Sequence, residues 1–134
     1  MSSQVRPAEV TALSLLFVFG AVMSGLTVIM LLFRGGPLDA LWTLNPHARD
    51  GLAAMGRWSL LLMAVVCVAC GTAALGLWRT TRWGFWSAVI VLSVNLTGDT
   101  ANAFIAHDWR TLIGLPIGGL MLSYLIMRRR IFVR

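Results

Sequence analysis

The sequence predicts an all-α, polytopic membrane protein: a bundle of four transmembrane helices with a short interfacial helix in the first outer loop. The 134 residues are 58% hydrophobic and only 12% charged, whereas soluble domains are about 45–50% apolar and about 25% charged. Four apolar stretches, each near the roughly 20 residues that a membrane crossing needs, occupy most of the chain. These two observations predict one domain over residues 1–134 and exclude a soluble enzyme, a disordered tail and a disulfide-rich secreted domain.

The first span is predicted at about residues 10–33, which carry no charge. Arg6 and Glu9 precede it, and Arg34 follows it. The apolar core of a cleaved signal peptide has only about 7–15 residues. Because this stretch is longer, we expect it to be a retained helix.

The loop after the first span contains apolar residues at helical spacing behind Pro37, namely Leu38, Leu41, Trp42 and Leu44. This spacing predicts a short helix that lies in the membrane interface. Asn45-Pro46 then resembles a helix start, with an N-cap followed by proline at the first helical position. A helix from there to Trp78 would be about 50 Å long, so we expect it to protrude or bend near Gly51 or Gly56.

The other three spans are predicted at about residues 58–78, 83–106 and 111–127. Only residues 79–82 separate the second span from the third. A connection of this length makes the two helices antiparallel neighbours.

Arginine provides all eleven basic residues, and these lie at the ends of the apolar spans rather than along one solvated face. Lipid bilayer rather than nucleic acid is therefore the expected partner. With the amino terminus in the cytoplasm, the inner side carries Arg6, Arg79, Arg82, Arg128, Arg129, Arg130 and Arg134, against Arg34, Arg49, Arg57 and Arg110 outside. The positive-inside rule thus predicts that both termini are cytoplasmic.

The third span carries Asn95, Asp99 and Asn102 at spacing i, i+4, i+7, which places them on one helix face. A carboxylate within a span is costly and must face protein or water. One interpretation makes Asp99 a proton or cation site, or the anchor of a polar ligand, with both asparagines as co-ligands. The other is an interhelical hydrogen-bond clasp, with Asp99 paired to Arg57 or Arg110.

Further polar residues fall on the same predicted outer side. They are His107, Asp108, Trp109 and Arg110 before the fourth span, and His47, Arg49 and Asp50 in the first outer loop. Together they could line a small pocket with charges of both signs. Asp108 has a simpler alternative role as a helix cap. Two isolated histidines do not predict a metal site, and no cofactor is predicted.

Small residues indicate close helix packing. Gly114 and Gly118 form a G-x-x-x-G in the fourth span, with Gly119 and Ser123 at the same spacing. These faces are compatible with a homo-oligomer but do not require one. Cys67 and Cys70 form a C-x-x-C deep in the second span, where we expect them to be small packing residues rather than a redox pair.

Four strings also resemble a group of small bacterial four-helix integral membrane proteins of no established activity. They are LWTLNP (41–46), GLWRTTRWG (76–84), VNLTGDTANA (94–103) and RTLIGLPIGG (110–119), within residues 38–130. The resemblance implies a multi-pass protein of the bacterial inner membrane and nothing about activity. The first span carries no such motif.

No nucleophile–base pair, metal cluster or phosphate loop is recognisable, so an enzyme is not favoured. The preferred function is a non-catalytic binding or assembly subunit, acting through its small-residue helix faces and outer polar cluster, in a homo-oligomer or a larger membrane complex. One alternative is an oligomeric channel or transporter for protons, ions or small solutes that uses Asp99. The other is a haem- or quinone-linked redox subunit using His47, His107 or the cysteines.

Overall fold

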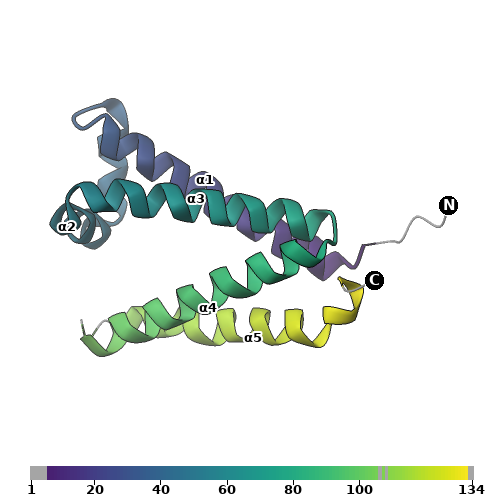
Figure 1. Ribbon diagram of the computed structural model, residues 1–134. Helices are drawn as coiled ribbons and strands as arrows, with labels where there is room; N and C mark the ends of the chain where they lie inside the picture. Colours follow the sequence, from purple (N-terminus) through teal and green to yellow (C-terminus); the bar gives the residue numbers. More distant parts are fainter. Residues whose placement is uncertain (1–5, 106, 108, 133–134) are drawn as a thin grey trace.

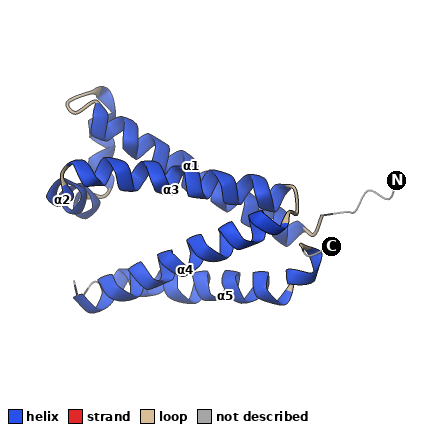
Figure 2. Cartoon of the chain, in the orientation of Figure 1, coloured by secondary structure: helices blue, strands red, loops and turns tan. Residues whose placement is uncertain are grey.

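The computed structural model describes residues 6–105, 107 and 109–132, and this part of the chain is helical without any strand (Figure 2). The α-helices are α1 (Ala8–Leu32), α2 (Pro46–Met55), α3 (Arg57–Trp78), α4 (Arg82–Ile105) and α5 (Gly114–Met127). Three 3₁₀ helices connect or extend them: η1 (Pro37–Leu44), η2 (Trp109–Ile113) and η3 (Arg129–Ile131). Four segments are long and apolar enough to cross a membrane: α1, α3, α4, and η2 with α5. The predicted all-α chain with four such segments is confirmed.

The four long segments pack mainly with their neighbours in the chain, as an α1–α3 pair and an α4–α5 pair joined through α3 and α4. Figure 1 shows that the two pairs meet where α3 turns into α4 and separate toward α2. We call the first end the arginine end, because Arg6, Arg79, Arg82, Arg128, Arg129 and Arg130 lie there. The other is the α2 end. The bundle is thus closed at the arginine end and open at the α2 end.

The buried core lies toward the arginine end and takes side chains from all four long segments. Its members are Val10, Leu13, Phe17, Cys70, Ala73, Ala74, Leu77, Phe85, Ala88, Leu92, Leu125 and Phe132. Phe132, just after η3, is only 1% exposed. Burying this ring holds the end of the chain against α4.

Small residues bring α1 and α3 together. The Ser14 hydroxyl donates to the Ala74 carbonyl at 2.8 Å, and the Cys67 thiol donates to the Ala21 carbonyl at 3.3 Å. A Cβ at Gly20 would lie 3.5 Å from the Cys70 sulfur. The cysteines therefore pack against α1, and both are free thiols, in agreement with the packing interpretation.

The turn between α3 and α4 depends on two glycines. The backbones of Gly76 and Gly84 touch, so a Cβ on either would overlap the other residue's backbone. Thr81 stabilises this approach, since its backbone N–H and its hydroxyl both donate to the Gly76 carbonyl, at 3.0 and 3.1 Å. The predicted antiparallel hairpin over residues 79–82 is present.

The loop between α1 and α3 contains two short helices. The predicted helix after Pro37 is the 3₁₀ helix η1, and Asn45 caps α2 by accepting from the Ala48 N–H at 3.1 Å. The long helix expected from Pro46 is interrupted at Gly56, which has φ +58° and ψ −132°. Gly51 continues the helix. The positive φ at the break is one that glycine adopts without strain and other residues rarely adopt.

The fourth segment changes from 3₁₀ to α-helix at Gly114. Pro116 is the third residue of α5 and has no N–H to donate, which the first turn of a helix tolerates. Pro116 therefore lies at the start of the regular helix and does not interrupt its interior.

Candidate functional site

The polar stripe of the third span lies on α4, in the half toward the α2 end. Asn95 and Asn102 are exposed, and Asp99 is half-buried. Asn95 lies 11 residues beyond Gly84 and Asn102 lies 18 beyond it, about three and five helical turns. Both asparagines therefore share the face of α4 that contacts α3 at Gly84. We call this face, defined by Gly84, Asn95 and Asn102, the inner face of α4.

The facing surface of α3 is apolar. Val65 and Trp58 lie 11 and 18 residues before Gly76, so in this antiparallel pair they stand at the levels of Asn95 and Asn102. Their side chains are 58% and 63% exposed. Because the two helical pairs separate here (Figure 1), the chain's own helices leave both surfaces uncovered.

Asp99 lies toward α5 at the edge of this face. Its Oδ2 would be 3.1 Å from a Cβ placed on Gly114, and the Leu96 side chain would be 2.8 Å from a Cβ on Gly118. Both glycines of the G-x-x-x-G therefore serve the contact between α4 and α5. Gly119 meets nothing within 4 Å and Ser123 is exposed, so the second pair of small residues faces away from this contact.

The clasp between Asp99 and an arginine is not formed within the described part of the chain. There, Asp99 has no hydrogen-bond or ion-pair partner, and Arg57 is an exposed residue that begins α3 on the other helical pair. Arg110 lies in η2 and is also exposed. Among the described residues, the start of α5 at Gly114 lies against this carboxylate.

The polar loop residues at the α2 end divide between the two helical pairs. His47 and Asp50 are exposed on α2, and Arg49 lines a pocket of about 160 Å³ with Arg34 and Asp39. His107 and Trp109 are exposed beside the start of the fourth segment, and Asp108 lies outside the described residues. Neither histidine lines the pocket beside Arg49.

Sequence reasoning missed two members of that pocket, Arg34 and Asp39. The Asp39 carboxylate accepts from the Gly35 N–H at 2.9 Å, which folds the loop back on the end of α1. A glycine with φ +83° at position 35 permits the turn. The Gly35-Gly36-Pro37 string was the available signal, because glycine and proline together predict a tight turn.

No family model, curated protein or solved structure matches this chain. The possible chemistry of the candidate site is therefore inferred from the side chains that form it. One carboxylate and two amides offer acceptors and donors for a polar helix face, a cation or a proton. Within the described residues, no three His, Cys, Asp or Glu side chains gather as metal ligands.

Proposed function

We propose that this protein is a small non-catalytic assembly subunit of a bacterial inner membrane, and that it binds a partner helix along the inner face of α4. The observation that carries the proposal is the exposure of Asn95 and Asn102 on a membrane-spanning helix. Asn95 lies about 16 Å along the helix from Gly84, near the middle of a hydrocarbon layer about 30 Å thick.

A polar group at the depth of Asn95 has no water to bind, so an unpaired amide there is costly and favours any partner that can hydrogen-bond to it. A helix placed between the two pairs would meet Asn95 and Asn102 on one side. On the other side it would meet Val65 and Trp58 of α3. This combination suits a helix that is apolar on one face and carries a few polar side chains on the other.

The proposal includes the placement of the chain in the membrane. Arginines dominate the end where α3 turns into α4, so the positive-inside rule puts this end and both termini in the cytoplasm. The α2 end then lies outside, with η1 in the interface. The resemblance to small bacterial four-helix membrane proteins supports the same location.

Native mass spectrometry of the protein, gently extracted from its own membrane, tests the assembly. The test variant is Asn95→Leu with Asn102→Leu, which keeps side-chain size and removes both amides. Thr97→Leu is the matched control, because Thr97 is exposed on the opposite face of α4 and its hydroxyl donates to Ser93 within its own helix. Subunit count and any foreign subunit are read from one spectrum.

We expect the wild type and Thr97→Leu to be recovered in the same assembly. Hydrogen bonds between membrane helices contribute about 0.6 kcal/mol each, so losing two should weaken the assembly by roughly one order of magnitude. A wild-type monomer without bound protein contradicts the proposal. Equal weakening by Thr97→Leu also contradicts it, since the inner face would then have no special role.

A second candidate function, conduction of protons or cations by an oligomer, is favoured by Asp99. It is a half-buried carboxylate inside a membrane-length helix, and ionisable side chains at such positions commonly mark ion or proton pathways. Flux into liposomes is compared for the wild type and Asp99→Asn. Flux lost in the variant supports conduction through Asp99, unchanged flux removes that role, and no flux in either removes the function.

A further inference from the structure

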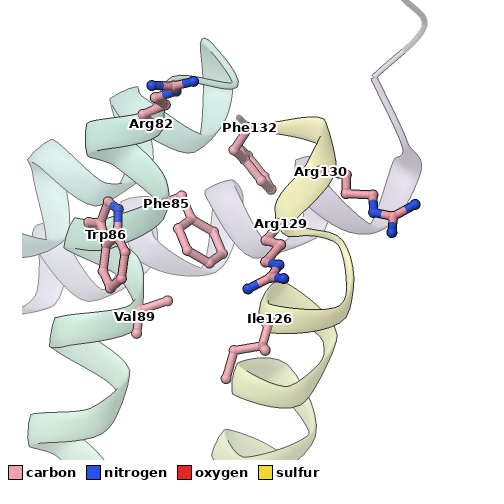
Figure 3. A pocket seen from close by; sticks show the side chains of 8 residues that line it. All are labelled: Arg82, Phe85, Trp86, Val89, Ile126, Arg129, Arg130 and Phe132. Carbon is pink, nitrogen blue, oxygen red and sulfur yellow. The ribbon is translucent and has the colours of Figure 1, made fainter. Parts of the chain in front are cut away.

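A cavity at the arginine end belongs neither to the inner face of α4 nor to the outer loops. Its volume is about 690 Å³, within the range of sites that hold small molecules. The cavity lies between α4 and the end of α5, and Figure 3 shows the side chains around it. Its apolar walls are formed by Phe85, Trp86, Val89, Ile126 and Phe132.

Three arginines complete the lining: Arg82, Arg129 and Arg130. No acidic side chain is among the described residues around the cavity. In Figure 3 the Arg129 guanidinium points into the space between the two helices, toward Phe85, whereas that of Arg130 points away. The cavity therefore combines an apolar wall with a cationic rim in which Arg129 is the most directly placed group.

Packing holds Arg129 in this position. Phe132 is buried, and its ring centroid lies 5.6 Å from that of Phe85. This contact folds η3 back over the first turn of α4, so that Arg129 lies across the cavity from Phe85. The arginine rim is thus a product of tertiary packing and not of a single run of charges.

The cationic and the apolar parts of the cavity lie at the depths expected for lipid headgroups and acyl chains, respectively. Arg82 and Arg129 lie at the ends of apolar helices, where cationic side chains meet the headgroups. Val89 is seven residues farther along α4, about 10 Å deeper. Trp86 and Ile126 are 61% and 51% exposed, so the apolar wall opens toward the surrounding hydrocarbon.

We propose that this cavity binds an anionic phospholipid, with its phosphate on Arg129 and one acyl chain along Val89 and Ile126. Basic pockets between membrane helices recognise anionic headgroups by charge, while apolar walls accept the chains. The exposed side of the cavity lets the lipid enter from the bilayer. This inference does not depend on the proposed assembly, because it uses a different end of the molecule.

Lipid retention on the full chain tests the site. Purified protein in detergent is mixed with phosphatidylglycerol or with phosphatidylcholine of identical chains, and native mass spectrometry measures the fraction carrying one lipid. Arg129→Gln is compared with Arg128→Gln, which makes the same charge change in the neighbouring residue. Arg128 does not line the cavity and lies over the Tyr124 ring instead, 6.0 Å from its centroid.

We expect the wild type and Arg128→Gln to retain phosphatidylglycerol in preference to phosphatidylcholine. Arg129→Gln should bind phosphatidylglycerol about fivefold more weakly, the effect of one arginine near a membrane surface. Equal binding of the two lipids by the wild type overturns the proposal. Equal weakening by both variants also overturns it, because binding would then follow total charge alone.

The apolar wall needs its own variant. Val89→Phe fills the cavity from α4 without touching the arginines, and Ile90→Phe adds the same ring at a neighbouring position that is 58% exposed and outside the lining. We expect only Val89→Phe to reduce phosphatidylglycerol retention, with both variants melting near the wild type. If Val89→Phe has no effect, or if Ile90→Phe reduces retention equally, the acyl chain does not occupy this cavity.

Discussion

Cys67 and Cys70 lie on the side of α3 that packs against α1. Cys70 is 7% exposed, and the Cys67 thiol is half-buried and bonded to a carbonyl of α1. Their i, i+3 spacing turns both toward the same neighbour, so the C-x-x-C acts as part of a packing surface. The two cysteine side chains therefore fill space between α1 and α3.

This placement predicts that neither cysteine reacts in the folded protein. We expect a maleimide reagent to leave both thiols unlabelled in mild detergent, because burial hides the sulfur atoms and restricts access to the thiolate. In denaturing detergent both should react. Mass spectrometry counts the added labels, and rapid labelling of the folded protein would contradict the described packing of α1 on α3.

The junction of α3 and α4 is the element that joins the two helical pairs. Gly76 and Gly84 approach so closely that neither position has room for a methyl group. Gly71, also on α3 and half-buried, meets nothing within 4 Å. The same helix therefore offers one glycine required by packing and one that is not.

Gly76→Ala should destabilise the protein by about 1–3 kcal/mol, the usual effect of overpacking. Gly71→Ala should leave stability unchanged or raise it slightly, because alanine favours the helix. Unfolding in detergent, followed by loss of helical circular dichroism, compares the two with the wild type. Equal melting of all three proteins would show that the Gly76–Gly84 contact does not hold the pairs together.

Whether a feature of these elements could be predicted depends on how far apart in the sequence the interacting residues lie. The Asn45 cap, the proline after it and the short turn at residues 79–82 act over a few residues, and each is present as predicted. The position of the helix break was predicted only as a choice between Gly51 and Gly56. Both are glycines in similar surroundings along the chain, and only the folded backbone shows that Gly56 has positive φ.

Across the whole molecule, charge and shape define two different ends. The arginine end is closed by the shared core and carries the cavity with its cationic rim. The α2 end is open, and there the inner face of α4 is uncovered (Figure 1). The two proposals therefore concern opposite ends, and each can fail without the other.

Cysteine scanning tests the orientation of these ends. His47→Cys and Trp109→Cys place exposed thiols at the α2 end, and Arg79→Cys places one at the arginine end. In right-side-out membrane vesicles, an impermeant maleimide should label the first two variants, and Arg79→Cys only after permeabilisation. The reverse pattern would invert the orientation, and labelling of His47→Cys and Trp109→Cys from opposite sides would contradict an even number of crossings between them.

Composition and local patterns were enough to predict an all-helical chain with four membrane-length segments, because hydrophobic length and helix signals act along the chain. They also identified the polar stripe on α4, since residues at i, i+4 and i+7 share a face in any helix. Contacts between helices could not be read in this way. The division into two pairs, the exposure of Asn95 and Asn102, and the position of Arg129 across from Phe85 all depend on how glycine-lined backbones and a buried Phe132 pack in three dimensions. Such packing brings together residues that are far apart in the sequence. Because the helices carry similar apolar side chains on several faces, the sequence does not indicate which faces will be in contact.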